Sequence, residues 1–249
     1  MENENSVSFL VSGKTALFSD PVTRAGGEKC SYQVPTYQAL KGILESVYWK
    51  PTFVWHVDAV RVMNPICSHS EGIRPVNYSG GNTLSIYTYL TNVAYQVKAH
   101  FEWNENRPDL ANDRNENKHY FIAKRMIERG GRRDVFLGTR ECQAYVEPCK
   151  FDAEDTDKGH YCDTPELSFG LMFHGFNYPD ETGRNQLETR FWYPKMRNGV
   201  IEFCNPEECP VVRIIKKQKP KAFTIGKNVA GCDNLAEEVA SNGLDAEAL

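Results

Sequence analysis

The chain has 249 residues, of which 41% are hydrophobic and 25% charged, and this suits a globular protein of one large or two modest domains with a substantial core. No apolar run is long enough to cross a bilayer, and the acidic start of the sequence is unlike a signal peptide, so we expect a cytoplasmic protein with no membrane partner. The net charge is -4, but the last nineteen residues carry five carboxylates and no base, which leaves the rest of the chain close to neutral.

The first predicted elements are a strand and a helix. Residues 6–12 have the apolar composition of a strand, and a polar loop follows them. Pro35 fits the first position of a helix, because the N–H that proline lacks would be unbonded there in any case. The helix has an apolar stripe at spacings of three and four residues, formed by Tyr37, Leu40, Leu44 and Val47. Pro51 disfavours helical backbone just before it, so the helix should end near Tyr48 and Trp49.

Two strands and a second helix are predicted next. Residues 52–63 are rich in β-branched and aromatic side chains, and residues 93–103 alternate apolar with polar side chains, so both segments are predicted strands. The segment between them is a predicted loop. The second helix should run from about 118 to 129, with Asn117 as its N-cap and the Gly130-Gly131 pair as its stop.

The order of these elements indicates the fold class. Residues 134–146 are a further predicted strand, and the resulting order βαββαβ is the signature of a ferredoxin-like, RRM-like domain of the α+β class, which we expect over residues 1–150. Short strands are predicted at residues 167–177, 188–193 and 199–203. They indicate a small antiparallel β domain over residues 151–225, followed by an acidic tail at 226–249 that is a weak helix or disordered.

The topology of a βαββαβ unit predicts that two distant segments meet. If the first strand runs upward, the right-handed crossover brings the first helix down to the lower edge, and the second helix starts at that same edge. Tyr48 at the end of the first helix should therefore lie beside Lys118 and His119 at the start of the second. Residues 114–133 are rich in lysine and arginine, and so are residues 213–227, which is compatible with a nucleic-acid partner.

A tyrosine, a lysine and a histidine on a basic surface suit metal-independent cleavage of RNA. RNA carries its own nucleophile, the 2′-hydroxyl, so the protein needs a base, a cation for the charged transition state and an acid for the leaving oxygen. His119 can be the base or the acid, and a position at a helix N-terminus beside a lysine should lower its pKa. Lys118 can neutralise the phosphate, and Tyr48 can orient the 2′-hydroxyl or donate a proton.

Two plainer interpretations stay open at this point. A Lys-His pair at a helix start is commonly solvated, and a tyrosine at a helix end commonly packs on its own sheet.

The eight cysteines form no CxxC pair, although Cys204 and Cys209 are separated by four residues and Cys142 and Cys149 by six. We therefore expect free thiols, no metal site and no cofactor, with a zinc protein built on these cysteines as a distant alternative.

Several stretches resemble the subtype I-C CRISPR-associated Cascade endoribonuclease, a RAMP-superfamily member of the fifth Cas protein family. The motifs that carry the resemblance are ALFSDP at 16–21, PTYQALKGI at 35–43, YWKPT at 48–52, GGRRDVFLGTREC at 130–142 and HGFNYP at 174–179. The likeness runs from about residue 6 to 215 and leaves out the acidic tail. It implies a ferredoxin-like domain followed by a small β-sheet domain.

The resemblance also implies an activity. Members of this family process precursor CRISPR RNA at the 3′ base of the repeat hairpin without a metal, and they leave a 2′,3′-cyclic phosphate and a 5′-hydroxyl. The family's catalytic tyrosine, lysine and histidine fall on Tyr48, Lys118 and His119. The expected partners are the repeat hairpin, the 5′ handle of the mature crRNA, and the backbone and large subunits of Cascade.

Arg132, Arg133 and Arg140 are candidates for contacts with RNA, because a guanidinium forms paired hydrogen bonds with phosphate or guanine. The alternative function is a structural subunit that binds the crRNA handle without cutting, as many relatives in other CRISPR subtypes do. The presence of Tyr48, Lys118 and His119 together favours the nuclease.

Overall fold

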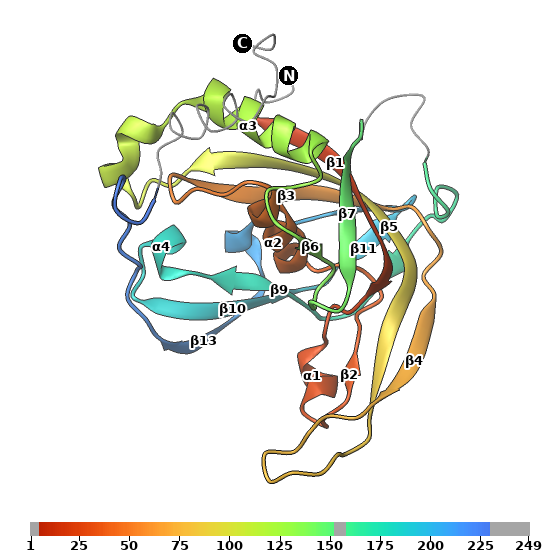
Figure 1. Cartoon of the computed structure of the whole chain (residues 1–249). Helices are drawn as coiled ribbons and strands as arrows, with labels where there is room; N and C mark the ends of the chain where they lie inside the picture. Colours follow the sequence, from red (N-terminus) through yellow and green to blue (C-terminus); the bar gives the residue numbers. More distant parts are fainter. Residues whose placement is uncertain (1–4, 152–157, 230–249) are drawn as a thin grey trace.

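The computed structural model describes residues 5–151 and 158–229, which form one large, mainly antiparallel sheet, a smaller sheet and two main helices (Figure 1). The large sheet contains β1 (Ser6–Ala16), β2 (Lys29–Cys30), β3 (Phe53–Val62), β4 (Ser68–Ile73), β5 (Ser85–Trp103), β6 (Val135–Phe136), β7 (Gln143–Pro148), β8 (Leu167–Ser168), β11 (Lys195–Arg197) and β12 (Val200–Glu202). The smaller sheet contains β9 (Met172–Asn177), β10 (Gln186–Trp192) and β13 (Val211–Lys217).

The helices are α1 (Pro21–Arg24), α2 (Tyr37–Val47), α3 (Glu116–Glu128) and α4 (Pro179–Thr182), with 3-10 turns η1 (Pro108–Asp113) and η2 (Pro206–Glu208). Helix α2 packs against β3 of the large sheet and β9 of the small one, whereas α3 packs against β1 and β7 (Figure 1). Among the described residues, no helix is long and apolar enough to span a membrane.

The core lies where the long strands β1, β3 and β5 pair. The large sheet runs in the order β6-β7-β1-β5-β3-β12-β11-β8, and β2 and β4 also pair with β5. In the register, Val11 lies opposite Tyr95 and Trp55 lies opposite Phe101, and all four side chains are buried. The alternation predicted for residues 93–103 is therefore confirmed, with apolar side chains covering one face of the strand.

The two main helices begin at other caps than the sequence indicated. The prediction that Pro35 begins α2 is wrong, because Thr36 is the N-cap and its side chain accepts a hydrogen bond from the Ala39 N–H. Asn117 is not the cap of α3; Asn115 is, and its side chain accepts from the Lys118 N–H at 3.1 Å. The predicted stop is confirmed, since α3 ends at Glu128 before the left-handed Gly130.

The strand predictions need three corrections. The segment 134–146 is two short strands, β6 and β7, because Gly138 reverses the chain between them at a φ of 94°. The loop expected before residue 93 contains β4 and the first half of β5. The strand predicted at 167–177 is two strands, β8 and β9, and the strands β11 and β13 were not predicted. Among the described residues, β8, β11 and β12 extend the large sheet through β3, whereas β9, β10 and β13 form a separate sheet. The acidic tail, 226–249, lies almost wholly outside the described residues.

We predict that Gly138→Ala destabilises the protein. A Cβ at this position would lie 2.0 Å from the backbone oxygen of Leu17, and the φ of 94° disfavours any side chain. A cost of about 1–3 kcal/mol is expected for forcing such a conformation, before the clash is relieved. Gly42→Ala in α2 is the control, because it meets no atom within 4 Å and should stabilise the helix by about 0.5–1 kcal/mol. Urea unfolding with equal midpoints for Gly138→Ala and the native chain would contradict the prediction.

Candidate active site

The predicted meeting of the two helices is observed as a direct hydrogen bond. Tyr48 is the C-cap of α2, where its backbone is extended, and His119 lies in the first turn of α3. The Tyr48 hydroxyl lies 2.8 Å from Nδ1 of His119. The Tyr48 carbonyl accepts a further hydrogen bond from the Trp55 indole at 2.8 Å, which fixes the end of the helix against β3. The topological inference from the sequence is confirmed for this pair.

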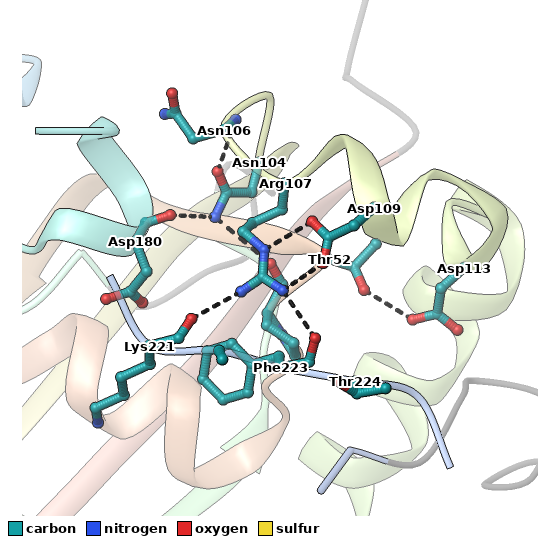
Figure 2. Close-up of polar contacts among 12 residues, drawn as sticks. Thr52, Asn104, Asn106, Arg107, Asp109, Asp113, Asp180, Lys221, Phe223 and Thr224 are labelled. Atoms are coloured by element: carbon teal, nitrogen blue, oxygen red, sulfur yellow. Dashed lines mark hydrogen bonds and ion pairs between the residues drawn. The ribbon is translucent and has the colours of Figure 1, made fainter. Parts of the chain in front are cut away.

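The other ring nitrogen of His119 settles the direction of these hydrogen bonds. Nε2 lies 2.7 Å from the backbone carbonyl of Asp113, and a carbonyl can only accept, so Nε2 carries the hydrogen. In the neutral imidazole, Nδ1 then carries the lone pair and accepts from Tyr48. The Asp113 carboxylate accepts from the Thr52 hydroxyl at 2.7 Å, a contact drawn in Figure 2. Thr52, Asp113, His119 and Tyr48 thus form one connected polar chain.

This polar chain is enclosed by aromatic rings. Tyr48 is 1% exposed and His119 0% exposed. Besides the Tyr48 ring at 5.9 Å, the rings of Phe53, Trp103 and Phe101 surround the imidazole at centroid distances of 5.2–6.3 Å. Burial lowers the pKa of His119 below its ordinary value, the contact with Asp113 opposes that shift, and the nearby Lys50 adds to it. The predicted direction is confirmed, but burial is the main cause and Lys50 is the cation involved.

Lys118 lies outside this enclosure. Its side chain is exposed at the start of α3, one residue before the buried imidazole, and its backbone N–H is held by the Asn115 cap. The structure therefore separates the three predicted catalytic residues into a buried Tyr48–His119 pair and a lysine on the surface.

Two of the three predicted RNA-binding arginines lie near the same edge. Arg132 and Arg133 are exposed, and with Trp49 and the end of α2 they line a cavity of about 250 Å³. Trp49 follows Tyr48 directly in the chain. Arg140 is also exposed but belongs to the turn between β6 and β7, where its guanidinium lies over the Phe136 ring at 5.3 Å.

The C-terminal segment 221–224 passes beside Arg107 (Figure 2) and contacts Trp49 through Phe223, an arrangement that the sequence did not suggest. Phe223 packs edge-on against the Trp49 ring at 5.6 Å. The segment is held by Arg107, whose guanidinium donates to the carbonyls of Lys221 and Phe223 at 3.2 and 3.1 Å. Asp109 fixes that guanidinium with two further hydrogen bonds, at 2.9 and 2.6 Å.

A second group of titratable side chains lies on the opposite face of the sheet. His100 precedes Phe101 in β5, so it points away from the His119 enclosure. Its Nδ1 lies 2.7 Å from the Asp58 carboxylate, and this hydrogen bond is the largest cause that raises the pKa of His100. His56 stacks on it at 5.4 Å, and burial lowers the pKa of His56 to about 4.

One group of three metal-ligating side chains gathers among the described residues: His174, Cys204 and Cys209. His174 stacks on Tyr37 at the start of α2, so this group lies at the opposite end of the helix from Tyr48. Cys142 and Cys149, the other cysteine pair noted in the sequence, do not join it.

Comparisons with known proteins agree on one family. A family model described as CRISPR-associated protein (Cas_Cas5) matches residues 6–204. The chain is 28% identical over 209 residues to the CRISPR pre-crRNA endoribonuclease Cas5d of Thermus thermophilus, covering 76% of this chain and 87% of the relative. It is 26% identical over 226 residues to the protein of the same name from Mannheimia succiniciproducens, covering 80% and 94%. A solved structure described as a CRISPR-associated protein is 38% identical, with a TM-score of 0.67 over 84% of this chain and 96% of the other.

We predict that His119 and His100 titrate on opposite sides of the ordinary histidine value. The pKa of His119 should lie below 6.5 because burial disfavours the imidazolium, and that of His100 above 6.5 because Asp58 favours it. The stability that neutral His119 contributes is then complete above pH 6.5 and is lost as the pH falls below it. Long-range ¹H–¹⁵N spectra of the imidazoles, assigned with His119→Asn and His100→Asn, measure both values. A measured pKa of His119 equal to or higher than that of His100 would contradict this prediction.

Proposed function

The chain belongs to the Cas5d family of CRISPR-associated proteins, and on that premise we propose that it is a metal-independent endoribonuclease that cuts precursor CRISPR RNA at the 3′ base of the repeat hairpin. Two relatives carry the name CRISPR pre-crRNA endoribonuclease. The observation that carries the proposal is the hydrogen bond between Tyr48 and His119, which unites two residues 71 positions apart at a basic edge of the sheet.

The proposed reaction uses the 2′-hydroxyl of the RNA as nucleophile. Nδ1 of His119 has the lone pair, and once the Tyr48 hydroxyl that it accepts from has turned away, it takes the proton of the 2′-hydroxyl as that oxygen attacks the adjacent phosphorus. The bond to the 5′-oxygen breaks, a 2′,3′-cyclic phosphate forms, and the leaving oxygen receives a proton from Tyr48 or from the His119 imidazolium. Lys118 neutralises the charge that builds on the phosphate in the transition state. Asp113 and Thr52 orient the imidazole.

Burial of the pair adds a step to this proposal. His119 and Tyr48 are at most 1% exposed, so the RNA must displace part of their cover before a 2′-hydroxyl can reach Nδ1. The segment 221–224 contacts Trp49, the residue after Tyr48, is held by hydrogen bonds from Arg107 and belongs to no strand of the core. We infer that RNA binding opens this side of the site. A neutral, buried imidazole is meanwhile kept in the basic form that the reaction needs.

The same burial favours a second candidate function. Tyr48, His119, Asp113 and Thr52 satisfy one another's hydrogen bonds, as a purely structural core network would. In that case the chain would bind the 5′ handle of the mature crRNA as a non-catalytic subunit of the type I-C Cascade complex, beside the backbone and large subunits. The nuclease proposal includes the same later role, so the two candidates differ in cleavage alone.

The strand order supports the ferredoxin-like part of the proposal. The central strands lie in the order β7-β1-β5-β3, with α2 between β1 and β3 and α3 between β5 and β7 along the chain. This corresponds to the βαββαβ unit proposed for residues 1–150. The three-stranded sheet of β9, β10 and β13 would then be the remainder of the small β domain.

We predict that a labelled cognate repeat hairpin is cut in EDTA by the native chain, and that Tyr48→Phe and His119→Ala bind it but cut roughly 10²–10⁴-fold more slowly. Lys118→Ala should lose rate with little change in affinity. Lys124→Ala is its matched control, because Lys124 is an exposed lysine on the same helix. Single-turnover rates and end-group analysis of the products provide the measurement. Tight binding without cutting by the native chain would assign it to the non-catalytic subunit.

We predict that Arg132, Arg133 and Arg140 bind the RNA backbone through charge. Replacing Arg132 and Arg133 together by alanine should reduce the slope of log Kd against log salt concentration by roughly 1.5 units, as expected for two lost phosphate contacts. Arg140→Ala alone should reduce it by about half as much. Arg197→Ala is the control, because that exposed arginine already pairs with Glu166. Fluorescence anisotropy over a salt series measures the slopes, and slopes equal to that of the native chain would remove these arginines from the interface.

A further inference from the structure

His174, Cys204 and Cys209 converge from three separate segments. His174 belongs to β9 of the small sheet, Cys204 comes two residues after β12 of the large sheet, and Cys209 follows η2. The η2 turn is closed by a capping box between Asn205 and Glu208, which returns the chain so that the two sulfurs face each other. One ring nitrogen of His174 and both sulfurs lie within 4.8 Å of one another.

The distance between the sulfurs excludes a disulfide and is compatible with a shared metal ion. The Sγ atoms of Cys204 and Cys209 are 3.8 Å apart, far beyond the length of a disulfide bond, which is about 2.05 Å. A tetrahedral zinc ion with Zn–S bonds of about 2.3 Å places two thiolate sulfurs about 3.8 Å apart. The observed separation therefore equals the edge of a zinc tetrahedron.

The histidine is held as a neutral ligand. His174 is 0% exposed, and its Nε2 lies 3.2 Å from the Cys204 carbonyl, to which it can only donate. The Nδ1 lone pair of this tautomer has no hydrogen-bond partner among the described residues. Stacking on Tyr37 at 4.3 Å and edge-on packing against Trp192 fix the plane of the ring. An imidazole oriented by a carbonyl on one nitrogen is the usual arrangement of a zinc ligand.

The surroundings favour negative charge on one of the two cysteines. The hydrogen bond between the two sulfurs is the largest cause of both shifts, since it lowers the pKa of Cys204 to about 5 and raises the pKa of Cys209. The positive charge of the Arg190 guanidinium opposes the shift at Cys209 and favours its thiolate form. Two thiolates and a neutral imidazole together neutralise a divalent cation, and soft sulfur ligands select zinc over magnesium or calcium.

We propose that His174, Cys204 and Cys209 bind a zinc ion that fastens the small sheet to the large one. His174 supplies the ligand from the small sheet, and the two cysteines supply theirs from the chain that leaves β12. Three protein ligands leave the fourth position of the tetrahedron to a water molecule or another ligand. The ion has a structural role in this proposal, remote from Tyr48 and His119 at the other end of α2, and it does not depend on the proposed RNA cleavage.

The test is the zinc content of the untagged, full-length protein expressed with added zinc and purified without chelators. Elemental analysis should find about one zinc ion per chain in the native protein and near none in Cys204→Ser and Cys209→Ser. Cys67→Ser should keep the zinc, because Cys67 is an exposed cysteine outside the group. Replacing zinc by Co²⁺ should give the visible absorption of a tetrahedral site and a thiolate charge-transfer band, both lost in Cys204→Ser.

A native protein without zinc, or equal zinc in both serine variants, would overturn the proposal. So would an intact mass, taken without reductant, that shows Cys204 and Cys209 joined as a disulfide. If the variants do not fold, the native chain decides: a strong chelator should lower its thermal transition by several degrees, and Zn²⁺ but not Mg²⁺ should restore it. A chain that holds zinc but does not cut the hairpin would reject the proposed nuclease and leave this site in place.

Discussion

Strand β5 is the constraint on which both faces of the protein depend. It is 19 residues long and pairs with β1 and β3 along one half and with β2 and β4 along the other. Because side chains alternate along a strand, Phe101 must point towards the enclosure of His119 while His100 points to the opposite face. A shift of the register by one residue would exchange the two faces. The strand pairing that builds the core therefore also fixes which side chains surround His119 and which face carries His100.

The enclosure of His119 connects stability with the proposed chemistry. Each of these buried hydrogen bonds contributes only about 0.5–1.5 kcal/mol net, but a buried donor or acceptor left without a partner costs about 1–3 kcal/mol. Removing the Tyr48 hydroxyl would leave Nδ1 unpaired in an aromatic surrounding, so that variant tests the packing as well as the reaction. The same surrounding keeps the imidazole neutral, which suits a base. The same rings also exclude RNA. Burial among them therefore keeps the imidazole basic and at the same time closes the site to the substrate.

The sequence predicted the elements whose patterns are local and missed those that depend on distant residues. β1, α2, β3, β5 and α3 were predictable because their apolar residues repeat with the helix or strand period. β4 was not, because it is an exposed, mostly polar strand whose pairing with β5 leaves no alternation. The meeting of Tyr48 and His119 followed from topology, but their burial did not, since rings such as Phe53 and Phe101 come from distant strands. Cys204 and His174 lie 30 residues apart and meet only through the packing of two sheets.

The two sites lie at opposite ends of α2, and this limits how the buried pair can open. At the start of the helix, Tyr37 stacks on His174 and is fully covered, and at its end Tyr48 is bonded to His119 and to the indole of Trp55. A helix fixed at both ends cannot slide or tilt to admit RNA without breaking one of these contacts. The segment 221–224 has no such constraint, because it is joined to the core mainly through Arg107 and one aromatic contact with Trp49. If the Tyr48–His119 pair acts on RNA, we therefore expect the C-terminal segment beside Trp49 to move rather than α2, which keeps the tyrosine and the histidine in register.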